Sequence, residues 1–253
     1  MSIELRWLTN ACYEINHHGT VIVTDPCLQW TAWPGFTVDD FKDGIDYVAI
    51  SHLHWDHITE LKEIEERFHP QYFSGVMGYP LFCEYLNPNT SLAYPMFPDQ
   101  CLAMDGFAVK CLYNRHWNVG KTFERQAAET DCAACFKMPS GMEKLQKMGG
   151  MDMNNYLFTF VDGLKVLFWG GDVTVSQKTM LKGMNPDIMI AQFSTKNMND
   201  RADLFTAIEP GVVLFHHQDI YDIPERYEPK IKAFSEIYKG RLVSPKHGEW
   251  MKF

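Results

Sequence analysis

The stretch His52-Leu53-His54-Trp55-Asp56-His57 carries more chemical information than any other part of this sequence. Its three imidazoles and one carboxylate are all side chains that bind transition metals. An apolar run, Asp46 to Ile50, precedes the stretch, and a helix-like segment, Glu60 to Ile64, follows it. The sequence therefore places these side chains on the turn after a buried strand, where α/β sheets carry their chemistry. Solvated histidines in a polar loop are the alternative, but so many metal-binding side chains at this density argue against them.

Four further apolar runs each lead to an acidic or histidine side chain. In chain order they are Thr20 to Thr24 before Asp25, Val109 to Tyr113 before His116, Lys165 to Trp169 before Asp172, and Gly211 to Phe215 before His216 and His217. The five motifs, in this order, resemble those of the metallo-β-lactamase superfamily of metal-dependent hydrolases. The joint match covers nearly the whole chain and is far more specific than any single motif.

The resemblance implies an α/β fold, the four-layer αββα sandwich in which two mixed β-sheets pack face to face. Periodicity alone predicts only a mixed α/β domain. A chain of 253 residues can bury a core of that size, so we expect one domain over residues 1–253. Within the superfamily the chain looks most like the branch that contains ascorbate-6-phosphate lactonase and N-acyl-phosphatidylethanolamine phospholipase.

The resemblance also implies two divalent transition-metal ions, with zinc expected first and manganese or iron as alternatives. Carried over motif by motif, the expected ligands are His52, His54 and His116 for one ion, Asp56, His57 and the histidine that ends the last strand for the other, and Asp172 as a bridge. Asp56 and Asp172 are also the residues that we expect to act in catalysis.

The last ligand is open between His216 and His217. Some relatives end this strand with a His-Trp-Asp-Asp-Phe pattern, and aligning it on His216 places Asp219 in the pattern. We therefore favour His216 as the ligand, with His217 as the alternative ligand or a pocket residue.

Several other residues near the motifs have weaker assignments. Asp25 is expected to orient ligands through hydrogen bonds rather than to bind metal. Trp55 and Trp117 either form aromatic walls beside the metals or pack in the ordinary way. His17 and His18 are expected to be solvated in a hairpin turn, and His247 to lie at the surface or the pocket rim.

Residues 117–152 form a long polar segment that leaves directly from His116. Segments of this kind are often lids or binding loops, so we expect a lid-like insertion over the metal site. The alternative is an oligomer contact, and a homo-oligomer is left open. Cys132 and Cys135 are interpreted as free thiols rather than as a redox or zinc pair.

The composition narrows the choice of partners. The net charge is −9 and no Lys/Arg-rich run is present, which argues against nucleic acid. No apolar run is long enough to span a bilayer, the N-terminus lacks the pattern of a signal peptide, and seven cysteines are an odd count, so we expect a cytoplasmic protein with reduced thiols.

We therefore expect a hydrolase that directs a metal-bridged hydroxide at a small organic substrate, such as a lactone, an amide or a phosphodiester. One alternative is a phosphodiesterase of cyclic nucleotides or nucleic acid. Another is an iron-dependent redox enzyme such as a persulfide dioxygenase. The third alternative is a non-catalytic metal-binding protein. The complete set of expected ligands argues against this alternative.

Overall fold

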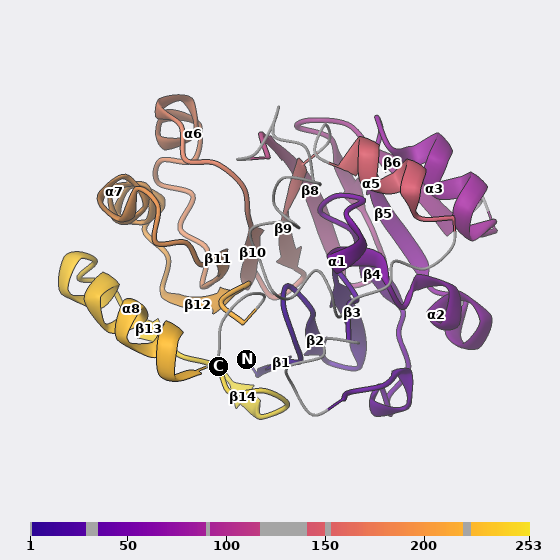
Figure 1. Cartoon of the computed structure of the whole chain (residues 1–253), viewed down its shortest axis with the longest axis horizontal. Coiled ribbons are helices and arrows are strands. Elements are labelled where there is room, and N and C mark those ends of the chain that lie inside the picture. The colour runs from indigo at the N-terminus through magenta and orange to yellow at the C-terminus, as the bar shows by residue number, and fades with distance from the viewer. Residues whose placement is uncertain (1, 29–34, 90–91, 117–140, 150–152, 220–223) are drawn as a thin grey trace.

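The computed structural model describes residues 2–28, 35–89, 92–116, 141–149, 153–219 and 224–253. Within these residues two seven-stranded sheets face each other, and helices cover the outer face of each sheet (Figure 1). The αββα sandwich predicted from the sequence is confirmed.

The first sheet contains both ends of the chain. Its strand order is β14 (Trp250–Lys252), β1 (Ile3–Trp7), β2 (Tyr13–His17), β3 (Thr20–Thr24), β4 (Tyr47–Ala49), β5 (Gln71–Gly75) and β6 (Ala93–Met96). Strands β3 to β6 are parallel, whereas β14, β1, β2 and β3 pair antiparallel. The residues that follow β3 and β4 therefore meet at one edge of the sheet.

The second sheet repeats this mixture of pairings. Its order is β13 (Leu242–Val243), β12 (Val212–His216), β11 (Ile188–Gln192), β10 (Lys165–Trp169), β9 (Met153–Phe160), β8 (Phe107–Asn114) and β7 (Cys101–Ala103). Strands β10 to β13 are parallel, and β7 to β10 pair antiparallel. The ends of β10 and β12 thus lie at the same edge, and both lead to predicted site residues.

Each outer helical layer buries one apolar face. The first sheet is covered by α2 (Leu61–Phe68), α3 (Tyr79–Leu86) and α5 (Glu143–Gly149), and the second by α6 (Val175–Met180), α7 (Met198–Ile208) and α8 (Pro224–Ile237). In α2, Leu61 and Ile64 are buried three residues apart, which is the spacing of one helix face. A short 3₁₀ helix (Val38–Asp40) precedes β4, and α1 (Trp55–Ile58) follows it.

The core between the sheets comes from alternating residues of the facing strands. In β1, for example, Ile3, Leu5 and Trp7 are fully buried in this layer. Two tyrosine hydroxyls cross the layer: Tyr13 donates to the carbonyl of Phe215 at 2.6 Å, and Tyr156 to that of Ile50 at 2.8 Å. The first and second sheets are therefore joined by polar bonds as well as by packing.

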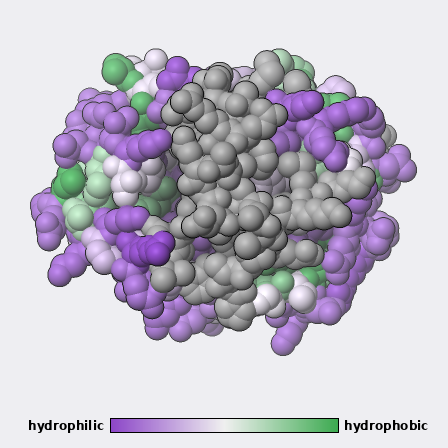
Figure 2. Space-filling view, viewed as in Figure 1, coloured by the Kyte–Doolittle hydropathy of each residue, from purple (hydrophilic) through white to green (hydrophobic). Residues whose placement is uncertain are grey.

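The face of the molecule in Figure 2 is largely polar. Outside the grey atoms, hydrophilic residues cover most of this face and leave small hydrophobic areas. The exposed large hydrophobic side chains of the described residues include Val175 and Met180 of α6. Among the described residues, no helix combines the length and the apolar character that crossing a bilayer would require.

Candidate metal centre

The histidine-rich motif lies directly after β4, at the edge predicted from the sequence. His54 is the N-cap of α1 and has extended backbone angles, and the helix then turns Asp56 and His57 into the interior. Because β3 pairs parallel to β4 with Thr24 opposite Ala49, Asp25 lies beside the start of the motif. Buried strand ends thus supply a rigid base for the motif.

The first cluster contains His52, His54 and His116, whose ligand atoms all lie within 4.8 Å of one another. The Nε2 atom of His52 is 3.0 Å from the Nδ1 atom of His54. Two imidazole nitrogens bound at about 2.1 Å to one tetrahedral ion lie about 3.4 Å apart. The three side chains therefore need only a small adjustment to hold one ion.

These three histidines are held in the state that metal binding requires. Burial, together with the neighbouring imidazoles, lowers the pKa of His52 well below its ordinary value. The same causes lower the pKa of His54 to about 3 and that of His116 to about 4. All three rings are neutral at pH 7, so an ion would not have to displace protons from them.

The second cluster contains Asp56, His57 and His217, whose ligand atoms also lie within 4.8 Å of one another. The Oδ2 atom of Asp56 is 3.4 Å from Nε2 of His57 and 3.6 Å from Nε2 of His217. The rings of His52 and His57 have centroids only 4.0 Å apart. The two clusters are therefore adjacent and suit a pair of ions.

In the second cluster, the proton on His57 offsets the negative charge of the neighbouring carboxylates. Burial would lower the pKa of His57, but the carboxylates of Asp56 and Asp25 raise it to about 10. Burial would likewise raise the pKa of Asp56, but His57 and His217 hold it well below its usual range. The buried Nε2 atom of His57 has no hydrogen-bond partner. Its lone pair would face the cluster once the proton leaves, so these residues fit a metal ion.

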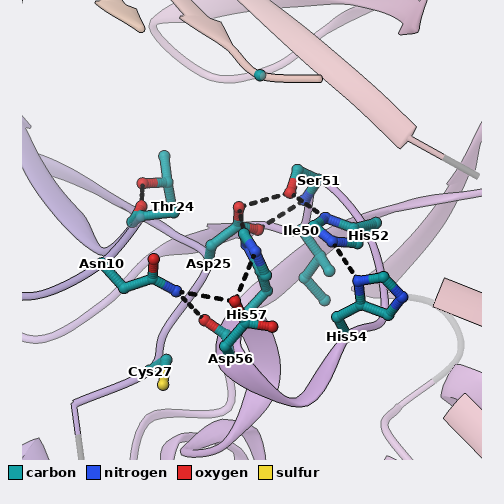
Figure 3. Close-up of polar contacts among 12 residues, drawn as sticks. Asn10, Thr24, Asp25, Cys27, Ile50, Ser51, His52, His54, Asp56 and His57 are labelled. Carbon is teal, nitrogen blue, oxygen red and sulfur yellow. Dashed lines mark hydrogen bonds and ion pairs between the residues drawn. The ribbon is translucent and has the colours of Figure 1, made fainter. Parts of the chain in front are cut away.

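Asp25 connects the two clusters through hydrogen bonds (Figure 3). Its carboxylate accepts the backbone N–H of Ser51 at 2.6 Å, the Ser51 hydroxyl at 2.5 Å and Nδ1–H of His57 at 2.7 Å. The Ser51 oxygen lies 2.9 Å from Nδ1 of His52. With Nδ1 occupied in both rings, Nε2 of His52 and of His57 faces the clusters. Ser51 had not been singled out from the sequence, although it directly precedes the motif.

The structure brings His217, and not the predicted ligand His216, into the second cluster. His216 belongs to β12, where its Nε2–H donates to the carbonyl of Trp169 at 2.9 Å and its ring stacks on Phe168. His217 has a left-handed backbone, with φ of 69°, and its N–H donates to the carbonyl of Asn10. This turn sends the His217 ring, rather than that of His216, to Asp56 and His57.

Asp172, the predicted bridging ligand, forms an ion pair in this structure. It follows β10 after Gly171, whose φ of 98° and contact with Asn114 leave no room for a side chain. The carboxylate of Asp172 pairs with the guanidinium of Arg115, the residue before His116. Among the described residues, neither cluster includes Asp172.

The remaining predicted residues are dispersed. The side chain of Trp55 is 8% exposed and packs in the same core cluster as Leu61 and Ile64 of α2, and its backbone N–H donates to the side-chain oxygen of Gln146. His247 stacks on Trp7 and is largely buried. His17 is buried rather than solvated, because its ring packs against Phe160.

Part of the predicted lid lies on the motif. A Cβ atom on Gly149, at the end of α5, would lie 2.7 Å from the backbone nitrogen of His54 and 2.8 Å from the carbonyl carbon of Leu53. Met142 and Leu145 are buried in the same core cluster as Leu53. Residues 117–140 and 150–152, which include Trp117, Cys132 and Cys135, lie outside the described part of the chain.

A family model described as "Beta-lactamase superfamily domain" matches residues 4–217. The chain belongs to this family. Membership confirms the family predicted from the sequence, a superfamily of metal-dependent hydrolases. The match spans the strands of both sheets that lead to the two clusters.

Sequence similarity to individual proteins covers only short segments of this chain, whereas similarity in fold extends over all of it. A UPF0173 metal-dependent hydrolase of Hyperthermus butylicus is 35% identical over 60 residues, or 24% of this chain and 26% of that protein. A 4-amino-L-phenylalanyl-[CmlP-peptidyl-carrier-protein] 3-hydroxylase of Streptomyces venezuelae is 36% identical over 59 residues, 21% of this chain and 11% of that protein. Each alignment thus spans well under two thirds of the relative. The structure of Igni18, a metallo hydrolase of Ignicoccus hospitalis, matches with a TM-score of 0.70 at 15% identity, covering 100% of this chain and 99% of that one.

Proposed function

We propose that this protein is a dinuclear metal-dependent hydrolase of a small organic substrate. The observation that carries the proposal is the adjacency of two three-residue clusters, with the rings of His52 and His57 only 4.0 Å apart. Metal pairs in hydrolytic enzymes lie about 3.5–4 Å apart, so the two ions of such a pair need ligand clusters that adjoin each other, as these do.

The ligands divide as the geometry groups them: His52, His54 and His116 for one ion, and Asp56, His57 and His217 for the other. Two ions bound there would supply a nucleophilic hydroxide at neutral pH and polarise the bond to be cleaved. Asp25 keeps Nε2 of His57 directed at the cluster, and Ser51 does the same for His52. These contacts fix the ligands before substrate arrives.

Asp172 remains our candidate for a shared ligand. Its ion pair with Arg115 is exposed, since the Arg115 side chain is 61% exposed. Exposed pairs contribute at most about 1 kcal/mol, so Arg115 holds the carboxylate only weakly. We expect Asp172 to leave Arg115 for the metals and Arg115 to become available to an anionic part of the substrate.

The experiment is metal analysis followed by an activity screen. The protein is stripped with a chelator, reloaded with Zn²⁺, Mn²⁺ or Fe²⁺, and assayed on lactones, amides and phosphodiesters, cyclic nucleotides included. We expect the wild type to bind about two ions per chain. Each of the single variants His54→Ala and His217→Ala should bind about one ion fewer. Full activity with a single bound ion would refute the dinuclear assignment.

Oxygen chemistry with iron is the second candidate. The local relative in Streptomyces venezuelae is a hydroxylase, and the second cluster offers two histidines and one carboxylate, a set that non-haem iron oxygenases use. Oxygen uptake by the Fe²⁺-loaded protein, without hydrolysis by the Zn²⁺-loaded protein, would favour this function over the first.

A further inference from the structure

A third group of metal-binding side chains lies outside the candidate metal centre. The ligand atoms of His17, His18 and Asp162 all lie within 4.8 Å of one another. His17 is the last residue of β2 and His18 lies in the turn to β3 in the first sheet, whereas Asp162 lies in the turn between β9 and β10 in the second. Residues from both sheets therefore meet at this group.

This group lies at the opposite end of the sandwich from the centre. His18 precedes the first residue of β3, whereas Asp25 follows its last, and β10 separates Asp162 from Asp172 in the same way. Each of these strands has five residues, which span about 16 Å at about 3.3 Å per residue. The third group cannot share an ion with the centre.

The turn between β2 and β3 brings the two imidazoles together. His18 and Gly19 have φ of 52° and 87°, which is the pattern of a type I′ hairpin turn. The side chain of Asn16 stabilises the turn by accepting the N–H of Gly19 at 3.2 Å. In this geometry the ring centroids of His17 and His18 lie 4.3 Å apart.

The facing turn holds the carboxylate in place. Oδ1 of Asp162 accepts the N–H of Leu164 at 3.2 Å, and Oδ2 lies 3.3 Å from Nε2 of His17. The bond from Leu164 also lowers the pKa of Asp162, so the carboxylate is charged at neutral pH. The N–H of Val161 donates to the carbonyl of Gly106, which fixes the turn against its neighbour.

His17 is the unusual member of the group. It is 3% exposed, and its ring packs against Phe160 with centroids 4.4 Å apart. Nε2 of His17 and Oδ2 of Asp162 are 3.3 Å apart but lack hydrogen-bond geometry, and among the described residues the buried Nδ1 atom of His17 has no hydrogen-bond partner. Leaving buried polar atoms without good hydrogen bonds costs free energy, whereas a bound ion would satisfy a nitrogen and the oxygen together.

We propose that His17, His18 and Asp162 form a second, separate binding site for a transition-metal ion of the zinc class, which links the two sheets at their turn end. Two imidazoles and a carboxylate suit Zn²⁺ and related ions. His18 is exposed, so the outer side of the site is open for water to complete the coordination. The site is independent of the proposed hydrolase activity.

Three variants test the proposal, and Zn²⁺ alone is the probe. His18→Gly removes one ligand while keeping the left-handed turn, because glycine accepts positive φ. Asp162→Asn removes the charge but keeps an oxygen for the N–H of Leu164. The matched control is His69→Gly, since His69 is an exposed histidine with φ of 48° that belongs to none of the clusters.

Chelator-stripped protein is dialysed to equilibrium against Zn²⁺ and its metal content is measured. We expect the wild type and His69→Gly to bind about one more Zn²⁺ per chain than His18→Gly and Asp162→Asn. In ¹H–¹⁵N spectra of the side chains, Zn²⁺ should move the resonances of the His17 ring in the wild type and in His69→Gly, but not in His18→Gly or Asp162→Asn. Equal Zn²⁺ content in all four proteins, with an unmoved His17 ring, would overturn the proposal and leave His17 and Asp162 as an ion pair. All variants keep both clusters of the centre, so the comparison holds whether or not the hydrolase assignment does.

Discussion

The Nδ1 atom of His57 lies 2.7 Å from the Oδ2 atom of Asp25, and both side chains are almost completely buried. The same carboxylate accepts the hydroxyl of Ser51, which in turn contacts His52. One aspartate thus positions a ligand in each of the two clusters, directly in one and through a serine in the other.

Asp25→Asn should therefore weaken metal binding at both clusters. Loss of a residue that orients a ligand typically lowers metal affinity about 10–100-fold. Competition with a coloured chelator measures the two affinities. Ser51→Ala is the control, because it should weaken only the cluster that contains His52. Unchanged affinity in Asp25→Asn would show that the ligands hold their orientation without it.

His217→Ala should affect metal content, whereas His216→Ala should affect the stability of the fold. His217→Ala removes a side chain of the second cluster, so metal content should fall by about one ion with little loss of stability. His216→Ala empties a buried position beside Phe168, so it should lower the free energy of unfolding by about 3 kcal/mol and retain both ions. Metal analysis and urea unfolding separate the two effects. Loss of an ion from His216→Ala alone would restore our original assignment.

Gly149→Ala should disturb the first cluster. In an ordinary helix this change is favourable by about 1 kcal/mol, but here the new methyl group meets the backbone of Leu53 and His54. Such overpacking costs about 1–3 kcal/mol, and the displaced His54 should bind metal less tightly. Chelator competition and thermal unfolding measure the two consequences. Gly35→Ala is the control, because nothing lies within 4 Å of its Cβ position. Wild-type affinity in Gly149→Ala would mean that α5 can move away from the motif.

Asp219 should make the metal-free protein less stable as the pH rises. Burial raises its pKa to about 7, from about 3.9 for an ordinary aspartate, even though the N–H of Asn10 donates to it. The folded state favours the protonated form, so the stabilisation is complete below about pH 4 and is lost as the pH passes 7. At about 1.4 kcal/mol per pKa unit, the loss is on the order of 4 kcal/mol.

Asp219→Asn should lack this contribution, so its stability relative to the wild type should increase as the pH rises from 4 to 8, and it should be the more stable protein at pH 8. Urea unfolding of the chelator-treated protein between pH 4 and 8 is the measurement. Asp203→Asn, at an exposed position on α7, should retain the wild-type slope. A slope in Asp219→Asn equal to that of the wild type would assign the dependence to another group.

Hydrophobic patterning predicted much of the framework. The run from Lys165 to Trp169 matches β10, and the helix-like segment from Glu60 to Ile64 coincides with the start of α2. Both were predictable because a buried strand and an amphipathic helix each have a characteristic spacing of apolar residues along the sequence. The motif of residues 52–57 could be found for a similar reason, since its metal-binding side chains lie close together in the sequence.

Features set by the backbone or by distant packing were not predictable. The choice between His216 and His217 depends on a positive φ at a residue other than glycine, which the sequence does not mark. The burial of His17 depends on Phe160, a residue 143 positions away in the other sheet. The contact of α5 with His54 arises from packing of the same long-range kind.

The tyrosine hydroxyls that cross between the sheets limit how this enzyme can move. Tyr13 is bonded to the carbonyl just before His216, and Tyr156 to the carbonyl just before Ser51. Separating the two sheets would break both hydrogen bonds beside the metal-binding motifs, and it would cost free energy wherever the hydroxyls and carbonyls stayed buried without partners. Any opening and closing around a substrate then falls to the loops at the strand ends, while the two sheets stay fixed relative to each other.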